Sequence, residues 1–136
     1  MDKTVILEVR DVVKIYPDGQ VRALNGVSLQ VFAGEFLVIR GPSGCGKSTL
    51  MHLLGGLDIP TEGEVLFRGI PLKEASKGKD FRVRNIGFIF QGFYLWQNLD
   101  VFDNVMLPLV ELEMSREERL ARVREAVKAV GLSDKL

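Results

Sequence analysis

Cysteine, histidine and tryptophan each occur only once in this chain of 136 residues. A single cysteine cannot form a disulfide within the chain, and its scarcity fits a reducing compartment. An excess of either charge is also lacking, since 18 Lys and Arg residues balance 18 Asp and Glu residues. Proteins that read nucleic acids usually carry a basic excess, so the charge balance predicts no nucleic-acid partner.

Long apolar runs are lacking as well. The longest uncharged stretch, residues 85–99, has 15 residues and contains Asn, Gln and Gly, whereas a membrane-spanning helix needs about 20 apolar residues. The N-terminus has no apolar core of the kind that a signal peptide requires. With 46% hydrophobic and 26% charged residues, the composition predicts a soluble, intracellular globular chain that forms one domain or a large part of one.

Apolar patterns predict strands in the first two thirds of the chain. Alternation of apolar and polar residues predicts strands at residues 4–16, 21–32 and 64–67. The second of these patterns is interrupted near Asn25 and Gly26. Two short continuous apolar runs, residues 36–39 and 86–90, are typical of strands buried on both faces of a parallel sheet. The polar, basic segment 68–84 is expected to be a solvated face.

The last third of the chain predicts helices. One is expected over residues 101–113, where Pro108 interrupts the pattern. Ser115 and Glu118 have the spacing of a capping box at the start of another helix. That helix is expected to stop at Gly131. Its apolar residues on one face are Leu120, Val123, Val127 and Val130.

The strongest motif is Gly-x-x-x-x-Gly-Lys-Ser at residues 41–48, between an apolar run and a helical pattern. Its glycines permit unusual backbone conformations and let N–H groups approach phosphate oxygens, and the N-terminus of the next helix points at the same anion. Lys47 supplies a positive charge for the β and γ phosphates, and the Ser48 hydroxyl is a hard ligand suited to Mg²⁺. The motif therefore predicts a nucleotide-binding loop, of a kind that serves kinases, GTPases and ATPases alike.

The loop and its flanking residues resemble the ATP-binding subunits of ABC transporters over essentially the whole chain. Residues 41–50, Gly-Pro-Ser-Gly-Cys-Gly-Lys-Ser-Thr-Leu, are similar to the family's Walker A motif, and residues 23–29 resemble the stretch before it. Residues 55–63 resemble the turn after the first helix, and residues 86–91 resemble the Q-loop. Residues 104–109 resemble the subgroup that releases lipoproteins and exports macrolides.

This resemblance implies an α/β fold, the P-loop NTPase of the ABC ATPase type, with ATP and Mg²⁺ as ligands. Residues 1–92 are expected to hold the antiparallel β subdomain and the first part of the parallel core. Residues 93–136 are expected to begin the helical subdomain. The implied nucleotide-binding residues are Tyr16, Gly41, Pro42, Ser43, Gly44, Cys45, Gly46, Lys47, Ser48 and Thr49.

The resemblance implies roles for two residues outside the loop. Tyr16 matches the A-loop aromatic that stacks on adenine; the alternative is a packed aromatic at a strand end. Gln91 matches the Q-loop glutamine, which can offer its amide oxygen to Mg²⁺ or to the attacking water; the alternative is a polar residue closing a strand. Lys47 and Gln91 are thus the implied catalytic residues, and Ser48 and Gln91 the implied metal ligands.

The resemblance also implies partners and a location. The expected partners are transmembrane permease subunits and a second nucleotide-binding subunit in a homodimer. The expected location is the cytoplasm, peripheral on the inner face of the cell membrane, where ATP hydrolysis drives export or lipoprotein release. Phe93, Tyr94 and Trp96 fit a docking surface for the permease and a buried cluster under the helical segment equally well.

The family's signature sequence, its Walker B strand ending in Asp-Glu and its switch histidine do not occur in these 136 residues. His52, the one histidine, lies elsewhere in the pattern. We therefore expect the chain alone to bind nucleotide weakly, to hydrolyse little of it, and to self-associate or need a partner for its sheet. The alternatives are a non-hydrolytic regulatory module and another P-loop enzyme such as a nucleotide kinase.

Overall fold

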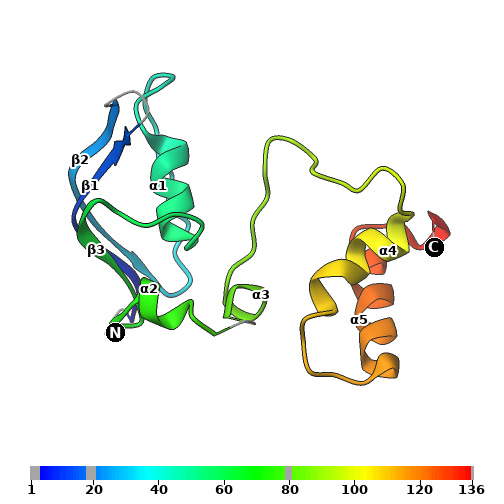
Figure 1. Cartoon of the computed structure of the whole chain (residues 1–136). Helices are drawn as coiled ribbons and strands as arrows, with labels where there is room; N and C mark the ends of the chain where they lie inside the picture. Colours follow the sequence, from blue (N-terminus) through cyan, green and yellow to red (C-terminus); the bar gives the residue numbers. More distant parts are fainter. Residues whose placement is uncertain (1–3, 18–20, 79–80, 136) are drawn as a thin grey trace. The chain divides into compact units, whose positions relative to one another are not determined.

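The computed structural model describes residues 4–17, 21–78 and 81–135. The chain folds into two compact units, Met1–Phe81 and Arg82–Leu136 (Figure 1). The predicted division into an ATPase core over residues 1–92 and a helical subdomain from residue 93 stays a prediction.

The first unit is built on a four-stranded antiparallel sheet. Its strands are β1 (Val5–Tyr16), β2 (Val21–Phe32), β3 (Glu62–Phe67) and β4 (Ile70–Pro71), in the order β2-β1-β3-β4. The three predicted strands at residues 4–16, 21–32 and 64–67 are confirmed. The interruption near Gly26 is a β-bulge, because the register between β1 and β2 shifts there and Gly26 takes φ +73°.

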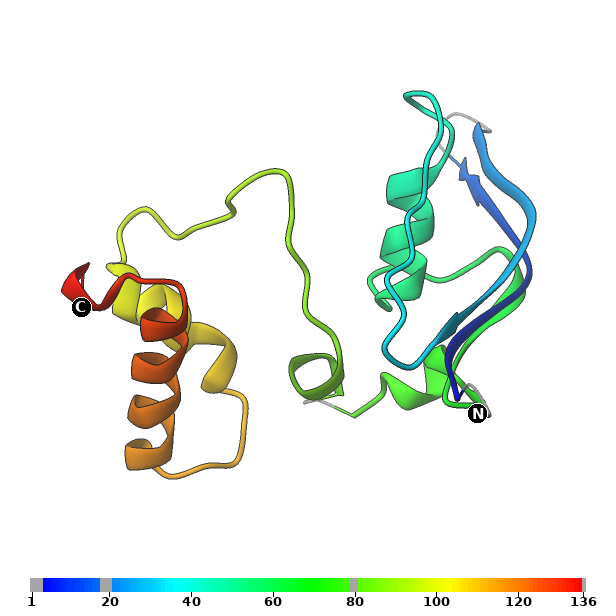
Figure 2. The same cartoon turned by 180° about the vertical axis from the view of Figure 1, so that it is seen from behind.

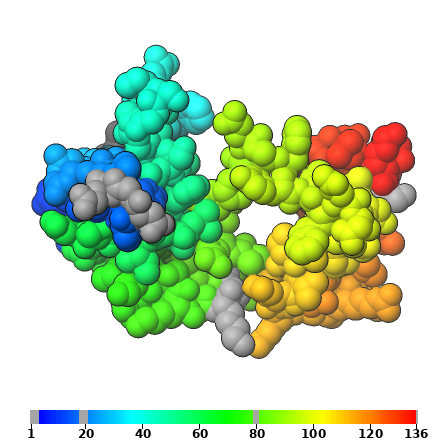
Figure 3. Space-filling model, turned by 45° about the horizontal axis from the view of Figure 1, so that its top comes forward, coloured from blue at the N-terminus to red at the C-terminus, as the bar shows by residue number. Residues whose placement is uncertain are grey.

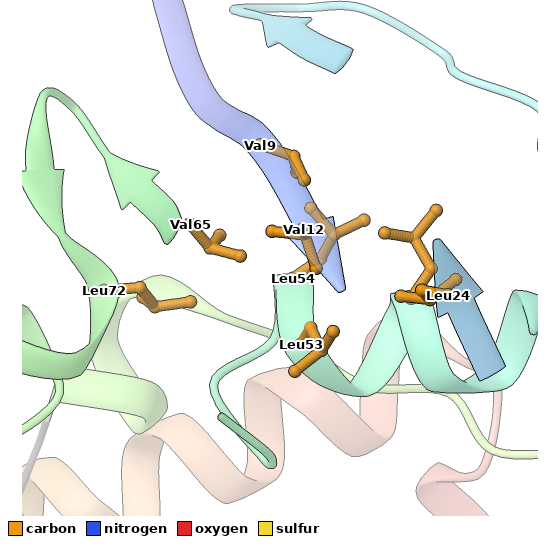
Figure 4. Packing of buried hydrophobic residues seen from close by; sticks show 8 residues of the cluster. Val9, Val12, Leu24, Leu53, Leu54, Val65 and Leu72 are labelled. Atoms are coloured by element: carbon orange, nitrogen blue, oxygen red, sulfur yellow. The ribbon is translucent and has the colours of Figure 1, made fainter. Parts of the chain in front are cut away.

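Helix α1 (Lys47–Leu54) packs against one face of this sheet and supplies much of its core (Figure 1 and Figure 2). Figure 4 shows Leu53 and Leu54 of the helix meeting Val9 and Val12 of β1. Leu53 is 1% exposed, and burial of such a side chain contributes about 1.5–3 kcal/mol. The buried cluster comprises Val9, Val12, Leu24, Leu50, Leu53, Leu54, Val65 and Leu72.

The basic segment after β3 is not simply a solvated face. It forms the short helices α2 (Leu72–Ala75) and α3 (Phe81–Asn85). Leu72 is buried in the core, and the Phe81 ring meets the Phe67 ring edge to face at 5.2 Å between centroids. Apolar residues inside the basic run therefore attach it to the sheet, while the charged residues that the structure describes in this run are exposed.

The predicted strands at residues 36–39 and 86–90 are wrong in this structure, since neither segment has regular secondary structure. Phe36 is 91% exposed and Ile89 is fully exposed, and only Ile39 packs against the core cluster. A strand that is apolar on both faces needs neighbours on both sides for its hydrogen bonds. No strand among the described residues pairs with either segment.

The second unit is helical. It contains α4 (Val101–Met106), the 3₁₀ helices η2 (Leu107–Leu109) and η3 (Ser133–Lys135), and α5 (Arg116–Ala129). The helix predicted over residues 101–113 ends at Met106 and continues as the 3₁₀ helix η2, in which Pro108 has no N–H to donate to a carbonyl four residues earlier. Val123 and Val127 are buried as predicted, but Val130 is 69% exposed because it is already the C-cap before Gly131. No helix in the described part of the chain is long and apolar enough to cross a membrane.

The predicted capping box at the start of α5 is confirmed. The Ser115 hydroxyl accepts a bond from the Glu118 N–H at 3.2 Å, and the Glu118 carboxylate accepts one from the Ser115 N–H at 2.8 Å. These bonds lower the pKa of Glu118 below its ordinary value.

Replacing Ser115 with alanine should destabilise α5 by about 1 kcal/mol, because an N–H in the first turn loses its acceptor. Hydrogen exchange of the α5 amides measures this effect. Arg124→Ala, an exposed change on the same helix, is the control. Equal exchange rates in Ser115→Ala and the unmodified chain would show that the cap contributes nothing.

Candidate nucleotide-binding site

The phosphate loop connects residue 41 to α1, and its glycines are required by its geometry. Gly44 and Gly46 take φ +78° and +93°, values that disfavour any residue with a side chain. A Cβ at Gly46 would lie 2.3 Å from the Ala23 carbonyl oxygen, and one at Gly41 would lie 2.6 Å from Cys45 Sγ. The loop is therefore a tight backbone cradle pressed against β2, and Figure 3 shows this part of the chain, in cyan, at the surface.

Lys47 lies over this cradle. Its ammonium group donates to the carbonyl oxygens of Gly41 and Pro42, at 2.9 and 2.7 Å, and lies 3.6 Å from Cys45 Sγ. These carbonyls are the acceptors that the cation takes from its own loop. A phosphate oxygen bound in the cradle is an alternative acceptor, and a stronger one because it carries charge.

The first turn of α1 keeps its backbone donors available. Its N-cap is Gly46, and no side chain caps the helix. The N–H groups at such a terminus favour an anion. Ser48 is exposed and Thr49 is half-buried in this turn, and Pro42 and Ser43 are exposed in the loop before it. All nine predicted loop residues thus lie together in the first unit.

Tyr16 lies at the end of β1, where it pairs with Val21 of β2. Its hydroxyl donates to Asp58 Oδ2 at 3.2 Å, and the Lys14 ammonium lies 5.1 Å from its ring centroid. Ala23, which the phosphate loop contacts, lies two residues beyond Val21, about 7 Å along the strand. Tyr16 and the phosphate loop therefore lie toward the same end of the β1–β2 hairpin.

Asp58 is a residue that sequence reasoning assigned only to a turn. Lys14 Nζ donates to Asp58 Oδ1 at 2.6 Å and to the Ile59 carbonyl at 2.8 Å. Burial raises the pKa of Asp58, but bonds from Lys14, the Ile59 N–H and Tyr16 outweigh it and hold that pKa below its ordinary value. The ionised carboxylate therefore stabilises the fold at neutral pH, and this contribution is lost as the pH falls through the folded-state pKa. The partners come from segments far apart in the chain, so no local sequence pattern signals them.

Gln91 belongs to the second unit, where it lies exposed in a bend just before the aromatic segment. Phe93, Tyr94 and Trp96 are 90%, 78% and 63% exposed. These side chains are not a buried cluster in the described structure. Lys47 and Ser48 belong to the first unit, so the phosphate loop is assembled without Gln91.

A pocket of about 410 Å³ lies at the other end of α1 from the phosphate loop. Its walls come from the C-terminal end of α1, the turn after it, β3 and α2, and Asp58 is part of its lining. None of the predicted loop residues lines it. No cluster of three or more His, Cys, Asp or Glu side chains suited to a metal occurs among the described residues.

Comparison with known proteins identifies the family of this chain. The family model described as ABC transporter matches residues 24–136. An uncharacterized ABC transporter ATP-binding protein of Thermotoga maritima is 45% identical over 96% of this chain and 58% of its own length. The macrolide export ATP-binding/permease protein MacB of Shigella flexneri is 41% identical over 97% of this chain and 21% of its own length.

Solved structures give the same result. The ATP-binding cassette MJ0796, in a dimeric post-hydrolysis state bound to ADP and Pi, is 40% identical and superposes with a TM-score of 0.79. That comparison covers 90% of this chain and 56% of the cassette. The chain thus spans a little over half the length of the Thermotoga relative and of this cassette. The chain therefore belongs to the ABC transporter family and has the fold of part of its ATP-binding cassette.

Proposed function

We propose that this chain binds ATP with Mg²⁺ through the loop at residues 41–49. The observation that carries this proposal is the geometry of the loop: a tight turn in which Gly41 and Gly46 have no room for a Cβ, a helix N-terminus without a side-chain cap, and the Lys47 ammonium bonded to the loop carbonyls. In this role the backbone N–H groups and Lys47 hold the β and γ phosphates, and the Ser48 hydroxyl holds Mg²⁺. Bound Mg²⁺ supplies neutralisation of phosphate charge.

We assign two further residues, Tyr16 and Gln91, to nucleotide binding. The half-buried Tyr16 ring lies toward the same end of the hairpin as the loop and supplies a stacking surface for adenine. Gln91 offers its amide oxygen to Mg²⁺ or to the attacking water. These 136 residues hold no Walker B carboxylate, so we expect them alone to bind nucleotide weakly and hydrolyse little of it.

In the whole protein we propose that ATP hydrolysis drives export or lipoprotein release at the inner face of the cell membrane. The partners are transmembrane permease subunits and a second nucleotide-binding subunit. The likeness to a protein named for macrolide export supports the direction of transport, and the dimeric cassette supports the pairing. The exposed Phe93, Tyr94 and Trp96 support a docking role for the segment after Gln91.

Modification of Cys45 tests the position of the bound phosphates. This residue is the one cysteine of the chain, it is exposed, and its Sγ is 3.6 Å from Lys47 Nζ. Alkylation with iodoacetamide should weaken Mg·ATP binding by at least about tenfold, or roughly 1.4 kcal/mol, because the adduct occupies the cradle. Isothermal titration of fully alkylated protein measures this effect.

The control is Cys45→Ser, which should bind Mg·ATP normally before and after the same treatment. An unchanged affinity in the fully alkylated protein would place the nucleotide away from this loop.

A further inference from the structure

The cluster of Lys14, Tyr16 and Asp58 joins the end of β1 to the turn after α1. Asp58 accepts from Lys14 through Oδ1 and from Tyr16 through Oδ2, while Oδ1 also accepts from the Ile59 N–H at 2.7 Å. Lys14 adds its bond to the Ile59 carbonyl and its position over the Tyr16 ring. The phenol is thus restrained both at its hydroxyl and at its ring.

Burial distinguishes this cluster from the ion pairs on the rest of the first unit. The side chains of Lys14 and Asp58 are 13% and 29% exposed. The pair of Lys77 with Glu74, by contrast, has side chains that are 67% and 54% exposed. Exposed pairs hold their partners weakly, whereas a charge-assisted bond that is partly shielded from water fixes geometry more strongly.

The backbone beside the cluster is tied down as well. The Thr61 N–H donates to the Val13 carbonyl at 2.8 Å, and the Thr61 hydroxyl accepts from the Ile15 N–H at 3.0 Å. The turn that carries Asp58 is therefore fixed against the strand that carries Tyr16. The same turn follows α1 directly, so one short segment connects the helix of the phosphate loop to the aromatic ring.

We propose that Asp58 is a positioning residue, which with Lys14 fixes the ring of Tyr16 so that a nucleobase stacks on it. This inference rests on the proposed function of the loop and assigns the triphosphate and the base to different residues. The loop binds the triphosphate whatever base is attached, and the Asp58 cluster sets how much the base adds to affinity. Loss of the cluster should leave the ring present but free to rotate, which makes stacking costlier in entropy.

The test compares two ligands, Mg·ATP and Mg·tripolyphosphate, by isothermal titration. Tripolyphosphate fills the phosphate loop and has no base. Asp58→Ala should weaken Mg·ATP binding by about three- to tenfold, which corresponds to a part of the free energy of one base–aromatic stack. Its affinity for Mg·tripolyphosphate should stay within about twofold of that of the unmodified chain. Glu74→Gln, which breaks the exposed pair, should change neither affinity.

Two further variants separate positioning from folding. Tyr16→Phe keeps the ring and Asp58 but removes the bond between them, so it should weaken Mg·ATP binding in the same direction and less. Tyr16→Ala should lose at least as much affinity for Mg·ATP as Asp58→Ala. The variant that carries both changes should lose no more affinity than Tyr16→Ala alone, because both residues act through one ring.

Three results would overturn the proposal. If Asp58→Ala weakened the binding of both ligands equally, and Tyr16→Phe bound both normally, Asp58 would merely stabilise the fold. If Tyr16→Ala left the ratio of the two affinities unaltered, Tyr16 would not stack on the base. The proposed function of the loop would still hold if Lys47→Ala weakened the binding of both ligands. Failure of the unmodified chain to bind either ligand would overturn the proposed function together with this inference.

Discussion

Replacing Lys47 with alanine is expected to weaken the binding of Mg·ATP by about ten- to a hundredfold, because charge-assisted hydrogen bonds contribute about 1.5–3 kcal/mol each. The ammonium group already lies over the loop, bonded to the carbonyls of Gly41 and Pro42. Binding of a triphosphate exchanges these neutral acceptors for charged ones. Isothermal titration at fixed, stated ionic strength measures the change, since salt screens such contacts.

The matched control for this variant is Lys77→Ala, which removes an exposed lysine from the same unit. It should bind Mg·ATP normally, because Lys77 pairs with Glu74 on α2 and not with the loop. If Lys47→Ala and Lys77→Ala bind equally well, nonspecific attraction between lysines and the nucleotide explains the affinity and the loop assignment fails.

Replacing Gly46 with alanine should lower the free energy of unfolding of the first unit by about 2–5 kcal/mol, of which a left-handed backbone accounts for about 1–2 and overpacking for the rest. The new Cβ would lie 2.3 Å from the Ala23 carbonyl oxygen and 3.0 Å from Leu24 Cδ2, so the loop must leave β2. Nucleotide binding should fall together with stability, since the displaced loop is the proposed cradle.

Gly44 provides a control within the same loop. It also has a positive φ, +78°, but a Cβ there meets nothing within 4 Å. Gly44→Ala should therefore lower the free energy of unfolding by only about 1–2 kcal/mol, the backbone cost alone. Urea unfolding followed by hydrogen exchange of the β1 and β2 amides reports on the first unit, whereas the single tryptophan lies in the second. Equal losses in the two variants would mean that Ala23 does not hold the loop.

Local features of the fold were predictable because short-range chemistry determines them. The helix that the phosphate loop leads into begins at Lys47, inside the motif, and the capping box at Ser115 forms with both of its bonds. Even Gly26, which only interrupted a strand pattern, marks a real bulge. In each case the residues that decide the conformation are close together in the chain.

Features that depend on distant partners were predicted poorly. The run at residues 36–39 has the composition of a buried strand, yet Phe36 is exposed because no described strand pairs with it. Apolar composition reports what a segment can bury, and it does not report what is available to cover it. The bond from Tyr16 to Asp58 shows the converse, since its partners are 42 residues apart and neither pattern signals the other.

Gly46 falls between these two cases. The motif predicts a glycine there, so that backbone N–H groups can approach a phosphate. The structure adds a second requirement from the Ala23 carbonyl, which faces the place where a Cβ would be. A motif residue can thus be selected by the ligand and by packing at once, and only the folded chain shows the second constraint.

The central claim is that the loop at residues 41–49 holds the phosphates of ATP. Backbone amide chemical shifts, followed while the chain is titrated with Mg·ATP, test it residue by residue. We predict that the largest changes occur at the N–H groups of residues 44–48 and saturate with the affinity measured by calorimetry. Changes confined to the pocket beside α2, or no change at saturating Mg·ATP, would contradict the assignment of this loop.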